Sequence, residues 1–268
     1  DIELAVAFFM NNQTMKIKLN GVTYYPIENP FTKSLFSKIK GQLTSQTFIE
    51  KIWLKSFLKV IDDFKPDIIE IFGSEQSFGQ VAQFTSIPVV LHIQGILTPC
   101  YNAFLPPSIS KHNYIWADLS PINVYRRYHE LTCFRKNGER EIKMIHQISY
   151  FIGRTEWDRR LTKLYNPQAR YFYGNEMLRD TFYEHERREL PNKSVFISTL
   201  SSPLYKGYGT VLKTANILKH IVGLDFDWKV YGNIDPKFTE HKLHLNHNDI
   251  NVHFMGIATV VEVHIAFL

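Results

Sequence analysis

The sequence predicts an α/β protein with parallel sheets, divided into two domains. Short apolar runs of strand type alternate along the chain with longer stretches whose apolar residues recur at helical spacing, as is typical of parallel α/β folds. The length of 268 residues suits two domains of about 100–150 residues each. A charged segment at 184–192, in which Pro191 blocks a helix, is the best candidate for the linker between them.

Strands are predicted where apolar or β-branched residues form short runs bounded by turn-forming residues. These runs are residues 2–9, 22–27, 67–73, 87–95, 149–153, 169–173, 194–198, 227–232 and 251–254. Helical spacing predicts helices over residues 32–63, divided in two near Gly41, and over 76–85, 121–147, 156–165 and 209–222. Prolines interrupt residues 96–120, which are therefore predicted to be an irregular loop of the kind that usually carries function.

Both ends of the sequence fall within apolar runs, which predicts a fragment of a longer chain. An exposed apolar end would favour aggregation in a complete protein. We expect residues 1–190 to form an N-terminal domain that lacks its first strand, and residues 191–268 to form an incomplete C-terminal domain.

Composition excludes several classes of protein. The 31 basic residues are offset by 26 acidic ones scattered among them, so nucleic acid is not an expected partner. The resulting net charge of +5 suits acidic substrates. Two cysteines cannot form a disulfide framework, which predicts a reducing compartment and a cytoplasmic location. No apolar run approaches the ~20 residues that a transmembrane helix needs.

The strongest local signal is the loop at residues 201–210, between a predicted strand and a predicted helix. Its glycines, among them Gly207, let backbone N–H groups approach a phosphate. The helix N-terminus adds partial positive charge, and Lys206 adds a full one. The pattern is neither a Walker loop nor GxGxxG, and the alternative interpretation is a surface loop whose lysine is solvated.

Three further groups of polar residues follow predicted strands, whose carboxyl ends bind ligands in open α/β sheets. His92 lies with Gly95 at the end of one strand, before the long loop, and could donate a hydrogen bond to a sugar hydroxyl or to a leaving phosphate. Arg154 follows another strand and could hold a phosphate or carboxylate with two hydrogen bonds. We predict that Arg154, Gly95 and Glu75 contact the sugar or the acceptor, since all three occupy this topological position.

Each of these groups also has a structural interpretation. His92 could be a core histidine that is hydrogen-bonded to backbone, and Ser74 with Glu75 could cap a helix. Around Arg154 the alternative is a helix start in which Thr155 is the N-cap and Trp157 packs in the core.

Two patterns suggest metal ligands, but neither supports a metal site. The Asp225-Phe226-Asp227 segment precedes a predicted strand, whereas a metal-binding Asp-x-Asp pair should follow one, so a turn is the favoured interpretation. His241, His244 and His247 recur every three residues, which places the third histidine off the face of the other two. We therefore expect a solvated polar helix there.

A basic stretch with interleaved aromatic residues could lie on an anionic membrane surface. Its basic residues are Arg126, Arg127, Arg135, Lys136, Arg140 and Lys143. Glu130, Glu139 and Glu141 interrupt the stretch, so a solvated helix–loop–helix is the favoured interpretation. Peripheral contact with the inner face of a membrane stays open as the alternative.

In order along the chain, several of these segments resemble the GT-B retaining glycosyltransferases of family four, of the bacterial polysaccharide type. The matching stretches are residues 65–75, 91–95, 151–158, 175–179 and 205–207. The resemblance implies a GT-B-like fold of two Rossmann-like domains that face each other across a cleft. The N-terminal domain would hold a glycan or lipid-linked acceptor, and the C-terminal domain a nucleotide-sugar donor, in capsule, lipopolysaccharide or exopolysaccharide synthesis.

The resemblance also implies roles for individual residues. Lys206 matches a family lysine that contacts the donor diphosphate, with Gly207 beside it, and His92 matches a histidine near the transferred sugar. The leaving diphosphate would itself act as the base, so neither a metal, a cofactor nor a protein nucleophile is implied. Positive charge at Lys206 and at the helix N-terminus would stabilise the developing negative charge.

The sequence departs from the family pattern in two places. An arginine is expected about six residues before Lys206, but the neighbourhood reads Ser198-Thr199-Leu200. A pair of glutamates that contacts the donor would lie beyond Leu268. We therefore expect the 268-residue chain to be weakly active or inactive while the longer protein transfers sugar.

Two alternatives from other functional classes follow. A non-catalytic relative that binds a nucleotide-sugar or a glycan would explain the missing arginine and glutamates. A dinucleotide-dependent oxidoreductase would need GxGxxG after a strand and an acidic residue about 20 positions on, and the sequence contains no such combination.

Overall fold

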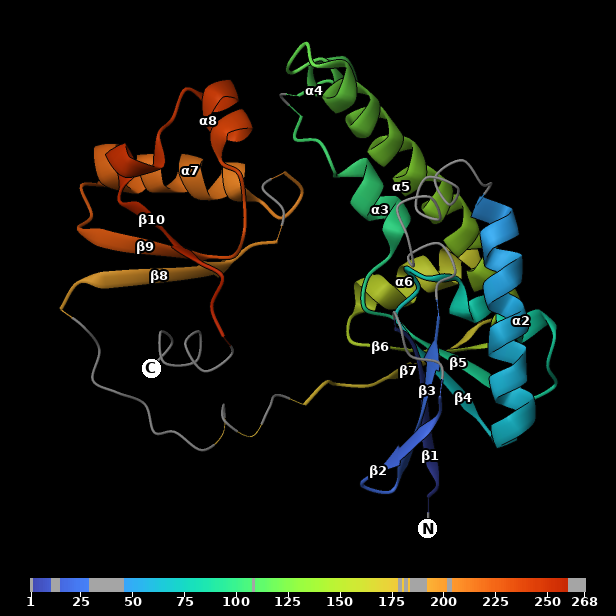
Figure 1. The fold of residues 1–268 in the computed structure, drawn as a ribbon. Coiled ribbons are helices and arrows are strands. Elements are labelled where there is room, and N and C mark those ends of the chain that lie inside the picture. The colour runs from blue at the N-terminus through green and yellow to red at the C-terminus, as the bar shows by residue number, and fades with distance from the viewer. Residues whose placement is uncertain are drawn as a thin grey trace. The chain divides into compact units, whose positions relative to one another are not determined.

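The computed structural model describes residues 2–10, 15–28, 46–107, 109–177, 180, 183, 192–201 and 204–259. The chain forms two compact units, one from residues 1–98 and 134–175, the other from residues 99–133 and 176–268. The helix α5 (Pro121–Gln147) contributes to both units (Figure 1). The expected domain boundary at 190/191 stays a prediction, because the segment 184–191 lies outside the described residues.

The first unit is built on a parallel sheet of four strands in the order β4-β5-β6-β7. These strands are β4 (Ile69–Phe72), β5 (Val89–His92), β6 (Tyr150–Gly153) and β7 (Arg170–Tyr173). The segments between them contain the 3₁₀-helix η1 (Ser77–Gln83), the helix α5 and the helix α6 (Glu156–Tyr165). The predicted strands and the helix over 156–165 are confirmed, and Thr155 caps α6 with a capping box to Asp158.

A second, three-stranded sheet in this unit has the order β1-β3-β2. β1 (Leu4–Phe9) runs parallel to β3 (Val22–Ile27), and β2 (Ile17–Leu19) forms an antiparallel hairpin with β3. The hairpin turns at Asn20-Gly21, where both residues have positive φ, which is the backbone of a type I′ turn. The helix α2 (Gln46–Phe64) follows. The predicted helix over 32–63 is thus described from residue 46 only.

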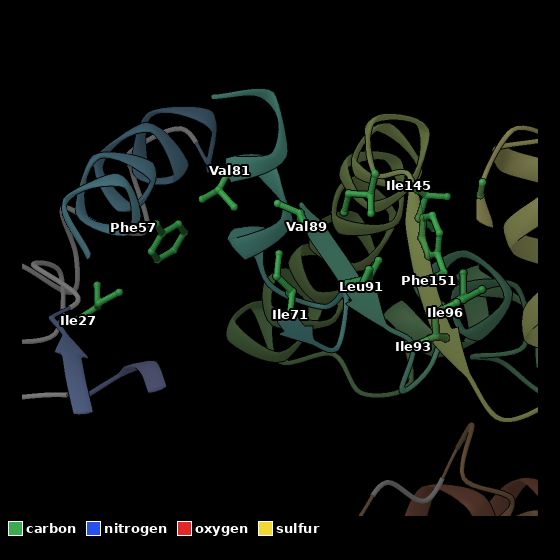
Figure 2. Packing of buried hydrophobic residues seen from close by; sticks show 12 residues of the cluster. Ile27, Phe57, Ile71, Val81, Val89, Leu91, Ile93, Ile96, Ile145 and Phe151 are labelled. Carbon is green, nitrogen blue, oxygen red and sulfur yellow. The ribbon is translucent and has the colours of Figure 1, made fainter. Parts of the chain in front are cut away.

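The core of the first unit lies on one face of the four-stranded sheet. Alternate residues of neighbouring strands, Ile71, Leu91 and Phe151, are buried there together with Ile145 of α5 (Figure 2). Because side chains alternate along a strand, Phe72 and His92 belong to the opposite face, where they are paired in register.

The second unit contains a parallel sheet of three strands in the order β10-β9-β8. These are β8 (Ser194–Thr199), β9 (Phe226–Tyr231) and β10 (Val252–Gly256). The helix α7 (Tyr208–Ile217) follows β8 and continues for one π-helical turn, Leu218–Val222. The helix α8 (Lys237–Leu243) and the 3₁₀-helix η4 (His247–Ile250) follow β9. Tyr208, Leu212, Phe226, Val230 and Val252 are fully buried between the helices and the sheet.

Several details of the sequence-based prediction are wrong. Residues 96–120 include two short helices, α3 (Leu97–Asn102) and α4 (Lys111–Ile115), because Ser110 caps α4 by accepting from the Asn113 N–H at 3.1 Å. The expected helix over 76–85 is 3₁₀, and Ser74 does not cap it. The basic stretch is one continuous helix, α5, rather than a helix–loop–helix. Trp157 is half exposed and not in the core.

Gly232 offers a test of the packing at the carboxyl edge of the second sheet. Its φ is +135°, and a Cβ there would overlap the carbonyl oxygen of Leu200. We expect Gly232→Ala to lower the free energy of unfolding by at least about 3 kcal/mol, since backbone strain and a clash with backbone combine.

Gly223→Ala is the matched control for this substitution, because Gly223 also has positive φ (+71°) but nothing within 4 Å of its Cβ position. Its expected cost is the backbone strain alone, about 1–2 kcal/mol. Urea denaturation of both variants measures the difference, and equal midpoints would contradict the packing described for Gly232.

Candidate functional site

The polar residues that follow β4, β5 and β6 meet at one edge of the first sheet. The strands are parallel and in register, so their carboxyl ends lie side by side. The Gly73 N–H donates to the carbonyl of His92 at 2.9 Å. Ser74 Oγ donates to the carbonyl of Gly95 at 3.1 Å. The structure therefore brings together the segments that contain Glu75, His92 and Gly95.

Arg154 joins the same edge from the end of β6. Its backbone N–H donates to Asp158 Oδ2 at 3.1 Å, and its Nη2 lies 3.4 Å from the carbonyl oxygen of Gln94. The guanidinium is exposed and is directed to the loop after β5 by this contact. The proposed roles of Glu75, Gly95 and Arg154 in binding sugar or acceptor stay predictions.

His92 is held by a carboxylate on the neighbouring strand. His92 is 9% exposed, and its Nδ1 lies 2.9 Å from Oε1 of Glu70 in β4. The edge of the ring contacts Phe72, with centroids 5.0 Å apart. Because an ionised carboxylate accepts from Nδ1–H, the other nitrogen, Nε2, is left for a ligand. The hydrogen-bond partner of His92 is thus the Glu70 side chain, and not the backbone group expected for a core histidine.

Two buried side-chain nitrogens at the end of β5 have no hydrogen-bond partner among the described residues. They are Nε2 of His92 and Nε2 of Gln94. Buried polar groups are almost always paired in native proteins, so an unpaired group at a strand end calls for an explanation. A ligand with hydroxyl or phosphate oxygens would supply the missing partners. Sequence reasoning did not select Gln94, because its position in the loop after the strand carries no chemical signal of its own.

A buried carboxyl group connects two loops of this site. Glu141 of α5 is fully buried and accepts from the Ser74 hydroxyl and, at 2.6 Å, from the Leu97 N–H. The Thr98 N–H also donates to it. One helical turn earlier, α5 approaches the loop so closely that a Cβ at Gly138 would lie 2.9 Å from Thr98 Oγ1. Glu141 therefore positions the loop after β4 against the loop after β5.

Burial raises the pKa of Glu141 to about 7. The negative charge of Glu75 adds to the effect, while the hydrogen bonds from Ser74, Leu97 and Thr98 oppose it. Ser74 Oγ has one proton for two neighbouring acceptors, the Gly95 carbonyl and the Glu141 carboxylate. When Glu141 is protonated, its own O–H can instead donate to Ser74 Oγ while the Ser74 hydroxyl donates to Gly95, so the neutral acid satisfies both contacts. Arg140 of α5 and Glu50 of α2 are two further charged residues near this site. Arg140 donates to the Glu75 carbonyl and pairs with Glu50 at 3.1 Å.

The sequence-based interpretation of Glu141 as a solvated residue is wrong. Gly138, Glu141 and Ile145 recur at intervals of three and four residues along α5, and all three are buried. That spacing placed Glu141 on the apolar face of α5, and it was the signal that could have identified this residue.

The loop before α7 has the strand–loop–helix form that the sequence predicts. Gly207 is the N-cap of α7, with φ +88°, and it provides no side-chain cap to the first N–H groups. Lys206 is exposed, and its Nζ lies 5.2 Å from the ring centroid of Tyr205. The Tyr205 ring stacks on Phe104 with centroids 5.9 Å apart. Residues 202 and 203 of this loop lie outside the described residues, and the assignment of Lys206 and Gly207 to a donor stays a prediction.

Residues of the two sequence patterns that suggested metal ligands make other contacts in the structure. Asp225 and Asp227 both pair with Lys193, at 3.1 and 3.0 Å, and Asp227 lies inside β9 instead of in the expected turn. The helix expected over the histidines ends at Leu243, because His244 adopts a left-handed conformation. His247 pairs with Glu240 at 2.6 Å. Within the part of the chain that the structure describes, no group of three or more His, Cys, Asp or Glu residues could hold a metal ion.

A search of the described residues for membrane-spanning segments found no helix with sufficient length and apolarity to cross a bilayer.

Solved structures show what class of fold these two units belong to. The protein is similar to sucrose-phosphate synthase from Thermosynechococcus elongatus, with a TM-score of 0.57 and 11% sequence identity over 97% of this chain and 62% of that chain. This likeness confirms the predicted fold class: α/β of GT-B type, with parallel sheets in Rossmann-like units. The chain thus spans 62% of the length of that enzyme.

A second similar structure is α,α-trehalose 6-phosphate synthase from Burkholderia multivorans. Its TM-score is 0.48 at 9% identity, over 97% of this chain and 66% of that chain. No protein-family model matches the sequence. No curated protein matches it either.

The pKa of Glu141 predicts how stability depends on pH. Between pH 4.5, the usual pKa of a glutamate, and about pH 7 the folded state holds more protons than the unfolded chain. The free energy of unfolding should therefore fall as pH rises through this window, by about 3 kcal/mol in total. Glu141→Gln resembles the protonated acid and should remove this part of the pH dependence, as measured by urea denaturation from pH 4.5 to pH 8.

Glu139→Gln serves as the control, because Glu139 is exposed on the same helix and pairs with Arg135 at 3.0 Å. In this variant the free energy of unfolding should depend on pH as it does in the unmodified protein. If Glu141→Gln kept that dependence as well, the burial of an acid with a raised pKa at this position would be refuted.

Proposed function

We propose that the protein is a glycosyltransferase that moves a sugar from a nucleotide-sugar donor to a glycan or lipid-linked acceptor. The observation that carries the proposal is the pair of buried, unpartnered nitrogens of His92 and Gln94 at the carboxyl end of β5. Oxygen-rich ligands such as sugars and phosphates would pair with them. The fold supports the proposal, because one similar solved structure is a sucrose-phosphate synthase.

The second unit would bind the donor through its diphosphate. The first N–H groups of α7 receive no side-chain cap, the helix N-terminus has partial positive charge, and Gly207 lets the backbone approach an anion closely. Lys206 adds a full charge at the same helix end. This arrangement favours a leaving diphosphate, whose negative charge grows as the glycosidic bond to the nucleotide breaks.

His92 would contact the transferred sugar or the leaving phosphate. Glu70 orients the ring through Nδ1, so Nε2 is available for a hydrogen bond with an oxygen of the sugar or of the leaving phosphate. Arg154 and Gln94 lie on the same strand edge and would fix the ligand's position.

The finer assignment follows the resemblance to family four. Transfer would proceed with retention, the leaving diphosphate would take the proton of the acceptor hydroxyl, and neither a metal nor a protein nucleophile would be required. The biological setting would be the synthesis of capsule, lipopolysaccharide or exopolysaccharide in the cytoplasm.

One observation favours a non-catalytic relative as the second candidate. The position six residues before Lys206 is Leu200, which is buried in the core of the second unit. Ser198, nearby in β8, accepts a hydrogen bond from Trp228 Nε1 at 3.0 Å. Neither position can provide the second cation that the family pattern expects beside the diphosphate. Donor binding without transfer, in the longest available form of the protein, would favour this candidate.

Lys206→Ala tests the donor site. Removal of a charge-assisted hydrogen bond should weaken binding of a nucleotide-sugar by about 1.5–3 kcal/mol. Calorimetric titration with UDP-glucose and GDP-mannose as probes measures the effect. Lys213→Ala, an exposed lysine within the same helix, is the control and should leave the affinity unchanged.

His92→Ala tests the sugar site. If Nε2 donates to an oxygen that gains charge in the transition state, kcat should fall about 100-fold while donor affinity changes little. His220→Ala, which removes an exposed imidazole in the second unit, should retain full activity. Equal kcat values for the two variants would contradict the role of His92.

A further inference from the structure

The start of α5 and the turn before it expose five large apolar side chains. They are Trp116, Leu119, Ile122, Tyr125 and Tyr128, which are 53%, 85%, 77%, 62% and 58% exposed. They recur every three residues, and α4 and the N-terminal end of α5 meet at a corner there (Figure 1). We call these five residues the apolar tip. A group of exposed apolar side chains of this kind marks an interaction surface.

The turn that carries the apolar tip is held by polar contacts. Asp118 accepts from the Ser120 N–H at 3.1 Å and pairs with Arg127 at 2.9 Å. The Tyr114 ring is buried under the turn, and its hydroxyl donates to Glu130 at 2.8 Å. The apolar tip is thus presented by an ordered turn, so its exposure is a property of the folded unit.

The charges around the apolar tip favour an anionic partner. The segment from Lys111 to Glu130 contains three basic residues, Lys111, Arg126 and Arg127, and two acidic ones, Asp118 and Glu130, so basic residues are in excess. Asp118 pairs with Arg127, and Glu130 accepts from the Tyr114 hydroxyl. Lys111 and Arg126 are exposed, and Lys111 donates to the Tyr101 hydroxyl at 3.0 Å. The exposed surface therefore combines aliphatic and aromatic side chains with basic ones.

We propose that the apolar tip docks on the surface of a bilayer that contains anionic phospholipids. Trp116, Leu119 and Ile122 would enter the boundary between headgroups and acyl chains, where tryptophan and tyrosine are favoured. Lys111 and Arg126 would lie close to the lipid phosphates. The proposal goes beyond the proposed sugar transfer and does not depend on it.

The size of the apolar tip favours a bilayer over a protein partner. A stable protein interface buries about 800 Å² on each side and involves 20–30 residues, with charged residues depleted at its centre. The apolar tip consists of five side chains at a helical corner, and the basic residues Lys111 and Arg126 are exposed on the same segment of the chain. Shallow insertion into a lipid surface needs no larger contact than this.

Sedimentation with vesicles tests the proposal on the purified protein. The unmodified chain should bind vesicles of phosphatidylcholine mixed with phosphatidylglycerol, and added salt should weaken that binding because it screens the lipid charge. Ile122→Glu should weaken it by about tenfold or more, since a carboxylate replaces a side chain at the lipid boundary. Leu119→Glu, placed in the turn, is the second variant and should have the same effect even if Ile122→Glu perturbs α5.

Ile221→Glu is the matched control, because Ile221 is 78% exposed, as Ile122 is at 77%, but lies in the π-helical turn after α7. It should bind vesicles as the unmodified protein does. No binding to the mixed vesicles, equal binding to pure phosphatidylcholine, or equal effects of Ile122→Glu and Ile221→Glu would each overturn the proposal. A dimer in size-exclusion chromatography that Ile122→Glu converts to a monomer would overturn it in favour of a protein interface.

Discussion

The carboxyl group of Glu141, removed from water inside the first unit, is the interaction on which the candidate site depends. It accepts hydrogen bonds from the loop after β4, through Ser74, and from the loop after β5, through Leu97. An unpaired buried carboxylate would cost several kcal/mol, so these donors must stay where they are. The backbone that carries Gly95 and leads back to His92 is thereby fixed.

Parallel strands supply the second constraint. Since β4, β5 and β6 run in the same direction, the residues that end them share one edge whatever their separation in sequence. Glu70 and His92 are 22 residues apart, yet their side chains lie 2.9 Å from each other across two strands. In the second unit the loop after β8 leads directly into the N-terminus of α7, whose first N–H groups receive no side-chain cap.

The helix α5 has different roles along its length. Towards its C-terminus the buried residues Gly138, Glu141 and Ile145 lie on one face, and Glu141, the polar residue among them, positions the loops of the candidate site. At its N-terminus the exposed residues are aliphatic, aromatic and basic. One helix can have a buried face and an exposed face, because every third or fourth residue returns to the same side.

By itself the sequence determined the local elements and the fold class. Short apolar runs located the strands, and Thr155 with Asp158 determined the start of α6, because these signals act over a few residues. Tertiary structure alone decided which polar groups are buried and what they contact. Whether Glu141 meets water or Ser74, and whether His92 meets backbone or Glu70, depends on segments distant in the chain, and no local periodicity encodes those partners. The exposure of Trp157 and of Ile122 was decided in the same way, since a large apolar side chain is buried only where another part of the fold covers it.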